Sequence, residues 1–221
     1  MPGRLVDVSH AVADGTITYP GLPAPEIGDH LSRERAEELY APGVTFQIGR
    51  ICMVANTGTY VDAPFHRFAD GVDLAGLELE DLAGRPGLVV DPPEGSGRAI
   101  GPDVFAGVEV AGRAVLVRTG WDRHWETPRY GEGHPFLTRE AADLLVDGGA
   151  AIVGIDSLNI DDTDDPQRPV HTALLGAGIP IVEHLCNLDA LPAEGFRFHA
   201  APVKVRGFGT FPVRAYAEVD G

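Results

Sequence analysis

Four short apolar runs, spaced widely along the chain, constrain the fold more than any other feature of the sequence. They cover residues 88–90, 114–117, 150–155 and 179–182. Short continuous runs that are rich in valine and isoleucine are typical of strands covered on both faces. The runs therefore predict a domain built around a sheet whose centre is buried.

The segments between and around these runs complete the expected fold. Residues 138–146 predict a helix, because Thr138 can cap its first turn and Gly148 follows its end. Short strands are expected at residues 5–8 and 44–54, and the alternation in residues 201–219 predicts a hairpin. Residues 29–40 are charged and are expected to form an exposed helix or an irregular arm. The fold class is thus α/β, with a mixed, mostly buried sheet.

Length and charge limit the domain organisation and the partners. The chain has 221 residues without a repeat or a low-complexity linker, so one domain is expected over residues 1–221. A formal net charge of −16 disfavours binding to nucleic acids and anionic membranes. Two distant cysteines predict no disulfide framework. No apolar stretch has the length of a signal peptide core or a membrane span, so we expect a cytoplasmic protein.

The most informative polar segment is residues 56–66. Asn56, Tyr60, Asp62 and His66 are separated by even offsets, so an extended backbone would project all four to one side. An aspartate and a histidine on one face can act as a metal ligand and a general acid/base. Equally compatible with this segment alone are an aspartate that closes a turn and a histidine on the surface.

A second candidate segment runs from His171 to His184. His171 is expected to open a short helix that ends near residues 176–178, and Glu183 lies at the end of the last apolar run. A carboxylate is costly to bury there unless it is paired or binds a metal. Strand alternation places His184 on the opposite face, in a structural role. Asp156, at the end of the third run, is expected to orient a ligand histidine or to form a turn.

The spacing of these residues resembles a known family signature. The cyclase family of metal-dependent hydrolases, which includes kynurenine formamidase and isatin hydrolase, has the pattern His-x-Gly-Thr-His-x-Asp-x-Pro-x-His, and this chain has Asn56-x-Gly58-Thr59-Tyr60-x-Asp62-x-Pro64-x-His66. Further matches follow the family order along nearly the whole chain. They are Asp7-x-Ser9-His10, Tyr19-Pro20-Gly21, Arg118-Thr119-Gly120-Trp121, His134-Pro135, Gly154-Ile155-Asp156-Ser157, His171 with Glu183, Asn187-Leu188 and Pro202-Val203-Lys204-Val205.

The resemblance implies a swivelling β/β/α fold and a set of site residues. It implies that Asp62, His171 and Glu183 are metal ligands and that His66 is the general acid/base. Asn56 and Tyr60 stand where the family has two ligand histidines. An amide or a neutral phenol binds metal much more weakly than imidazole, so one divalent ion is expected, zinc or manganese before magnesium.

Three interpretations of the function remain open. In the first, one metal ion and His66 hydrolyse a small amide, lactam, lactone or related carbonyl compound. In the second, the site is metal-free, and Tyr60 and His66 perform acid/base chemistry or the pocket only binds a small molecule. A purely structural or interaction protein is the third. Asn56, Tyr19 and Trp121 are the candidate substrate contacts. The resemblance also implies a homo-oligomer, a dimer or tetramer, whose active site lies near an interface.

Overall fold

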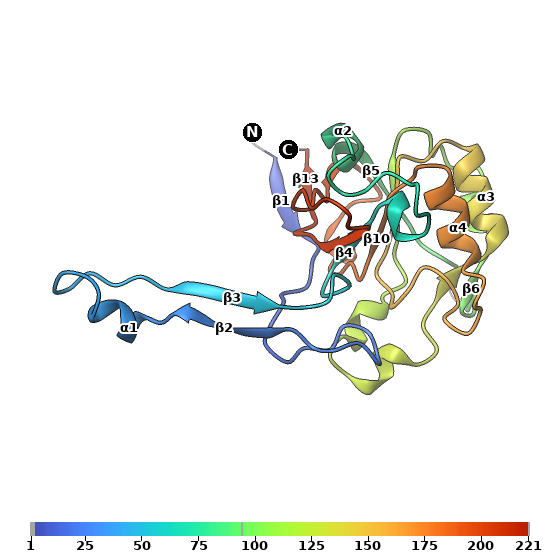
Figure 1. Ribbon diagram of the computed structural model, residues 1–221. Coiled ribbons are helices and arrows are strands. Elements are labelled where there is room, and N and C mark those ends of the chain that lie inside the picture. Colours follow the sequence, from blue (N-terminus) through green and yellow to red (C-terminus); the bar gives the residue numbers. More distant parts are fainter. Residues whose placement is uncertain (1–2, 94, 221) are drawn as a thin grey trace.

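The central sheet forms from the apolar runs and from strands near both ends of the chain. The structure, a computed structural model, describes residues 3–93 and 95–220, and nine strands of these residues form one curled, mixed sheet (Figure 1). In sheet order these are β1 (Arg4–Asp7), β13 (Tyr216–Val219), β11 (Glu194–His199), β5 (Ala83–Val90), β7 (Ala114–Val117), β9 (Ile152–Ile155), β10 (Ile181–Glu183), β4 (Tyr60–Asp62) and β12 (Thr210–Pro212). The strands β5, β7, β9 and β10 are parallel, and the remaining neighbours are antiparallel.

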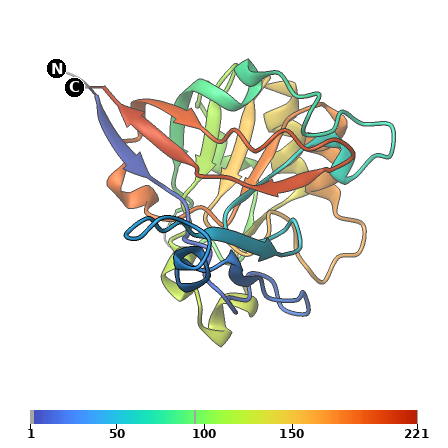
Figure 2. The same cartoon turned by 60° about the vertical axis from the view of Figure 1, so that its left-hand side comes forward.

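The four apolar runs are confirmed as the buried centre of the sheet, in β5, β7, β9 and β10. One face packs against α3 (Arg139–Asp147) and α4 (Pro169–Gly176), and the other lines the inside of the curl (Figure 2). Thr138 caps α3 as expected, because its hydroxyl accepts a hydrogen bond from the amide of Ala141. The α/β prediction is therefore correct.

The alternation of β4 and β10 explains how polar side chains reach the face covered by α4. Val61 and Val182 point into the curl, where both are fully buried. Their neighbours in the two strands point the other way. The antiparallel register places Tyr60 directly opposite Glu183, and Asp62 opposite Ile181. Two of the predicted site residues are thus brought together by strand pairing alone.

Two predictions about secondary structure need correction. The hairpin expected over residues 201–219 is wrong: β12 pairs with β4, while β13 pairs with β1 and β11. Alternation identifies a strand but does not identify its partner, and each of these strands satisfies its hydrogen bonds elsewhere. Likewise, α4 begins at Pro169, so His171 lies within its first turn and does not open the helix.

Residues 26–52 form an arm that extends away from the domain (Figure 1). It contains β2 (Glu26–Leu31), the helix α1 (Arg33–Glu37) and β3 (Ile48–Cys52), and β2 and β3 form a separate two-stranded sheet. The arm predicted at residues 29–40 is therefore present, and the strand predicted at residues 44–54 belongs to it. Large apolar side chains are exposed along the arm: Ile27, Leu39, Tyr40, Val44, Phe46, Ile48 and Ile51.

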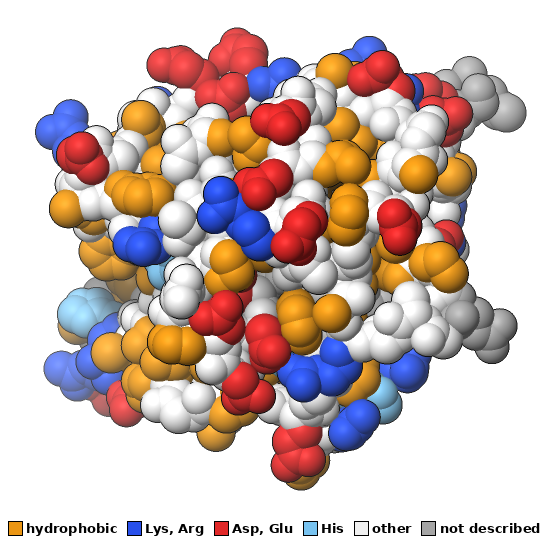
Figure 3. Space-filling view, turned by 90° about the vertical axis from the view of Figure 1, so that its right-hand side faces the viewer, with side chains coloured by type: hydrophobic (Ala, Val, Ile, Leu, Met, Phe, Trp, Pro, Cys, Tyr) orange, Lys and Arg blue, Asp and Glu red, His pale blue; other side chains and the backbone are white. Residues whose placement is uncertain are grey.

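The remaining elements are short and lie in the connections. They are η1 (Pro64–His66), α2 (Leu79–Leu82), β6 (Ala99–Ile100), η2 (Pro102–Phe105), η3 (Trp121–His124), η4 (Pro128–Gly131), β8 (Phe136–Leu137) and η5 (Leu188–Ala190), with β6 and β8 paired in parallel. No helix in the described part of the chain is both long and apolar enough to cross a bilayer. On the face that carries α3 and α4, acidic side chains are mixed with basic and apolar ones (Figure 3).

Candidate functional site

A cavity of about 320 Å³ opens beside β4, β10 and α4 and collects most of the predicted site residues. It is lined by Tyr19, Leu22, Asn56, Tyr60, His66, Arg67, Asn159, Arg168, His171 and Glu183. Asp62 is fully buried next to this lining and contacts His171. Of the predicted site residues, Trp121 is the one that the structure does not bring to the cavity. Its ring packs with Tyr130 and Leu158, and its Nε1 donates to the carbonyl of Tyr130.

Asp62 presents a carboxylate oxygen that the described residues leave unpaired. Its Oδ1 accepts a hydrogen bond from the hydroxyl of Thr210, whereas its buried Oδ2 has no hydrogen-bond partner in the described part of the chain. This Oδ2 lies 3.7 Å from Nε2 of His171. Burial raises the pKa of Asp62, but the imidazoles of His171 and His66 outweigh it, so the pKa lies below its ordinary value. Asp62 is therefore a buried anion with one free oxygen.

The ring of His171 is oriented by Asp161, which the sequence analysis did not identify. Oδ2 of Asp161 lies 2.6 Å from Nδ1 of His171 and also accepts the backbone amide of that residue. Nδ1 therefore carries the proton, and Nε2 faces Asp62 and Glu183. Burial lowers the pKa of His171, but the carboxylates of Asp161, Asp62 and Glu183 raise it to about 10. The loop around residue 161 offered no periodicity that could have revealed this contact.

Glu183 is held by three donors from the protein. Its Oε1 accepts the backbone amide of Ile160 at 2.6 Å, and its Oε2 accepts the hydroxyl of Tyr60 at 2.6 Å and Nδ2 of Asn159 at 3.3 Å. Oε1 also lies 3.7 Å from Nε2 of His171. Burial raises the pKa of Glu183 to about 7, although His171 acts in the opposite direction.

A buried chain of hydrogen bonds continues from Tyr60 into the protein. Nε2 of His184 lies 3.2 Å from the hydroxyl of Tyr60, and Nδ1 lies 2.8 Å from the hydroxyl of Tyr130. Burial lowers the pKa of His184 to about 3, so its ring is neutral. The Tyr60 proton points to Glu183, and we therefore assign the ring proton of His184 to Nε2. The expected opposite-face position of His184 is wrong because its φ of 56° breaks the strand alternation.

His66 lies at the cavity mouth and is tied to Asp62 through one hydroxyl. Oγ1 of Thr210 lies 2.8 Å from Nδ1 of His66 and contacts Oδ1 of Asp62. A carboxylate can only accept, so the threonine proton goes to Asp62, and the threonine oxygen accepts from Nδ1 of His66. Nε2 of a neutral His66 is then left without a proton. Thr210 is separated from Asp62 by 148 positions, which hid this contact from the sequence analysis.

Three side chains, Asp62, His66 and His171, bring ligand atoms close enough to hold one divalent metal ion, and Glu183 approaches this group only through its 3.7 Å contact with His171. Ligand atoms of Asp62, His66 and His171 lie within 4.8 Å of one another. Two ligands about 2.1 Å from one tetrahedral ion lie about 3.4 Å apart, close to the two 3.7 Å contacts of His171. Burial and the charge of Glu183 raise the pKa of Tyr60 well above its usual range, so this phenol stays neutral and is a poor ligand.

Asp156 does not orient a ligand histidine, which was the first of the two alternatives predicted for it. Its Oδ1 accepts the backbone amide and the hydroxyl of Thr119, and its Oδ2 accepts the amide of Gly120. The second alternative, a carboxylate that fixes a turn, describes this arrangement. Burial raises the pKa of Asp156 to about 6, and these donors act against it.

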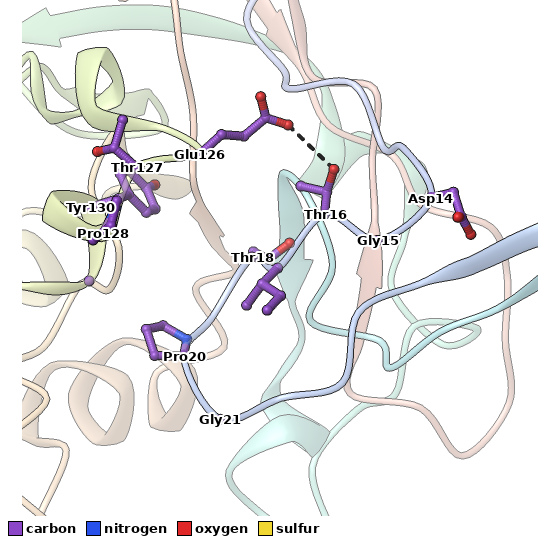
Figure 4. Close-up of a pocket in the computed structure, with 12 residues that line it drawn as sticks. Asp14, Gly15, Thr16, Thr18, Pro20, Gly21, Glu126, Thr127, Pro128 and Tyr130 are labelled. Atoms are coloured by element: carbon purple, nitrogen blue, oxygen red, sulfur yellow. Dashed lines mark hydrogen bonds between the residues drawn. The ribbon is translucent and has the colours of Figure 1, made fainter.

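A second cavity, of about 580 Å³, lies between the N-terminal loop and the segment around η4 (Figure 4). Its lining consists mainly of turn residues, and its two carboxylates are already engaged. Asp14 accepts the amide of Ile27, and Glu126 accepts the hydroxyl of Thr16. Of these two cavities, the smaller one, which adjoins the unpaired carboxylate oxygen of Asp62, is therefore the better candidate for a functional site.

Comparison with known proteins shows which family the chain belongs to. The Cyclase family model, described as "Putative cyclase", matches residues 6–162. The chain is 27% identical over 211 residues to kynurenine formamidase of Bacillus cytotoxicus, and the aligned region covers 95% of each protein.

Two solved structures have the same fold. Isatin hydrolase A from Labrenzia aggregata, bound to benzyl benzoate, is 25% identical and superposes with a TM-score of 0.85 over 99% of this chain and 94% of that one. A protein described as a predicted metal-dependent hydrolase from Bacillus stearothermophilus is 28% identical, with a TM-score of 0.75 over 97% of each chain.

Proposed function

Because this chain belongs to the Cyclase family, we propose that it is a hydrolase that cleaves a small amide, lactam, lactone or related carbonyl compound with one divalent metal ion. The relatives named kynurenine formamidase and isatin hydrolase support this reaction class. One observation carries the proposal: the buried, unpaired Oδ2 of Asp62 lies 3.7 Å from the correctly oriented Nε2 of His171. Two such groups are costly to bury without a cation between them.

Asp62, His171 and Glu183 would hold the ion, which we expect to be zinc or manganese. Once bound, a divalent ion supplies positive charge that polarises a carbonyl group and lowers the pKa of a water molecule. Asp161 supports this binding because it keeps the proton of His171 on Nδ1 and leaves Nε2 to face the other two ligands.

His66 would act as the general acid/base. The hydroxyl oxygen of Thr210 accepts a hydrogen bond from Nδ1–H of His66, so Nε2 of the neutral ring is free to take a proton from the nucleophile and later return it to the leaving group. The side chain is partly exposed at the cavity mouth, where a substrate can reach it. Tyr60 would hold Glu183 in place through its hydroxyl, and Asn56 and Tyr19 would contact the substrate.

Metal content tests the proposal directly. Protein purified without a histidine tag and supplied with zinc or manganese is expected to retain about one ion per chain, measured by elemental analysis. Retention below about 0.1 ion per chain would remove the metal from the mechanism. His66→Ala should abolish turnover and leave the metal content unchanged; lost metal would make His66 a ligand.

A metal-free site is the second candidate, and the contacts of Glu183 favour it. This carboxylate already has three protein donors, and the high pKa of His171 allows an imidazolium to stand between the carboxylates. The site would then bind a small molecule or perform acid/base chemistry through Tyr60 and His66. Turnover that survives exhaustive treatment with a strong chelator would support this candidate over the first.

We also propose that the protein forms a homo-oligomer through the arm. Its exposed apolar side chains, which include Phe46 and Ile51, are expected to be covered by a second copy of the chain. Replacing both with serine should shift the molecular mass, measured by light scattering, toward that of one chain. An unchanged mass would place the interface elsewhere.

A further inference from the structure

The cavity mouth carries two arginine side chains that the mechanism does not use. Arg67 follows His66 directly in the chain, and Arg168 immediately precedes α4. The chain has 33 acidic and 17 basic residues, so basic side chains are the minority on this molecule. Two of them line one small cavity beside the buried acidic groups of the site.

Neither guanidinium is neutralised by a carboxylate. Nε of Arg67 donates to the hydroxyl of Thr172, and Nη1 of Arg168 donates to the backbone carbonyl of Asp162. Within the described residues, no carboxylate oxygen lies within 4.0 Å of either group. Each of the two contacts engages one nitrogen, and Arg168 also interacts with the hydroxyl of Tyr19. A guanidinium has five N–H donors, so each side chain retains donors for a ligand in the cavity.

The backbone of Arg168 adds an independent observation. Its φ of 48° and ψ of 60° lie in the left-handed region, where a residue with a long side chain is uncommon. Glycine or asparagine adopts this conformation with less strain. Strained residues cluster at active sites and ligand-binding sites, and Arg168 is half-buried and lines the cavity.

The charge of the buried carboxylates at the inner end of the cavity is compatible with an anion at the cavity mouth. With the divalent ion of the proposed function bound, Asp62 and Glu183 would both be ionised, and their two negative charges would balance the ion. The two arginines then leave the mouth positively charged. Guanidinium groups bind carboxylates through paired N–H donors, and Tyr19 and Leu22 offer apolar surface beside them.

We propose that Arg67 and Arg168 form an anion subsite that selects substrates carrying a carboxylate group next to an apolar or aromatic body. This inference rests on the proposed function for its reaction, whereas the subsite itself can be tested by binding. The substrate class is thus an anionic amide or lactam small enough for a cavity of about 320 Å³.

Binding is measured first, with benzoate and its neutral analogue benzamide, by thermal shift and calorimetry on the metal-loaded protein. Benzoate is expected to bind roughly tenfold more tightly than benzamide, and added salt should reduce the difference. Arg67→Gln and Arg168→Asn should each remove most of this preference. Asparagine is chosen at position 168 because it tolerates the left-handed backbone.

Two controls separate charge from folding. Arg139→Gln, on the exposed surface of α3, should behave as the wild type. Arg67→Lys should retain part of the preference, because it keeps the charge and loses the paired donors. Equal binding of benzoate and benzamide, no binding of either, or a preference that survives both cavity substitutions would overturn the subsite.

Turnover then distinguishes the subsite from the reaction. Formanilide and the three formamidobenzoate isomers differ only in the carboxylate, and kcat/KM is expected to favour at least one of the acids by roughly tenfold. Hydrolysis without an anion preference would refute the subsite and leave the proposed function intact. A benzoate preference that depends on both arginines, with no hydrolysis of any probe, would support the subsite and count against the proposed function.

Discussion

The hydroxyl of Tyr60 donates a hydrogen bond to Oε2 of Glu183 across 2.6 Å, at a directly paired position of β4 and β10. The family signature has a histidine at this position, so a phenol stands where an imidazole would offer a ligand nitrogen. The phenol instead donates a hydrogen bond to the carboxylate of Glu183. His184 does not supply the missing ligand nitrogen, because its Nε2, in the tautomer assigned above, donates its proton to the phenol oxygen of Tyr60.

Restoring the two imidazoles should therefore change the metal content. In the double variant Asn56→His with Tyr60→His, the metal content is expected to rise from about one ion per chain toward two, because neutral imidazole is a strong ligand for zinc and manganese. Elemental analysis after gel filtration measures the content. Tyr60→Phe is the control and should show no rise. An unchanged content in the double variant would mean that the backbone no longer offers a second site.

The carboxylate of Asp161 should control metal affinity without touching the metal. Asp161→Asn keeps the size of the side chain but weakens its hold on Nδ1 of His171, and we expect a 10–100-fold lower affinity for zinc. Competition with a chromophoric chelator measures this change. Asp164→Asn, an exposed position in the same loop, serves as the control. Equal affinities in the two variants would contradict the orienting role.

Thr210 should matter for turnover more than for metal binding. Thr210→Val has nearly the same shape but removes the hydroxyl between Asp62 and Nδ1 of His66. The ring tautomer is then no longer fixed, and kcat is expected to fall at least about tenfold while the metal content is retained. Thr210→Ser should restore most of the rate. A normal kcat in the valine variant would show that His66 does not depend on this bond.

Local patterns were sufficient to predict the centre of the fold. Residues 114–117 form β7 without any difference in bounds, because a short β-branched run has few other stable environments. The pattern also indicated that Glu183 needs a partner where it is buried, whereas the set of Asp62, His171 and Glu183 came from the family resemblance.

Contacts between distant segments were not accessible in this way. Thr210 and Asp161 orient the two histidines, but serine, threonine and aspartate occur in most loops, and only the fold shows which ones are neighbours. The pairing of β12 with β4 was missed for the same reason. His184 was misplaced because alternation assumes an extended backbone, and its φ of 56° lies outside that region.

The two cysteines are expected to differ strongly in reactivity. Cys52 is exposed on the arm, whereas burial and the nearby carboxylates of Asp122 and Asp7 raise the pKa of Cys186 to about 12. At pH 8 the thiolate fraction of Cys186 is then about 10⁻⁴, and the thiolate is the reactive form. A colorimetric thiol reagent should label Cys52 at least about 100-fold faster than Cys186. Cys52→Ser should abolish the fast phase; a fast phase that persists would contradict the assignment.

Asp156 should make the protein less stable as the pH rises from about 4 to about 6. Burial raises the pKa of this carboxyl from its ordinary 3.8 to about 6, so the folded state binds a proton that the unfolded state has already released. In this window the unfolded state binds fewer protons, and the free energy of unfolding therefore decreases with pH. A shift of about two pKa units corresponds to roughly 3 kcal/mol, which is fully expressed only above pH 6.

Asp156→Asn isolates this contribution, because the amide does not ionise. Urea unfolding at several pH values between 4 and 7 should show that the stability of the variant relative to the wild type rises with pH, because only the wild type loses stability as its carboxyl ionises. The relative gain should reach roughly 3 kcal/mol by pH 7. Asp103→Asn, at an exposed position of η2, should follow the wild type throughout. If the difference between Asp156→Asn and the wild type stays constant across this range, the carboxyl of Asp156 titrates alike in the folded and unfolded states, and its burial does not penalise the charge.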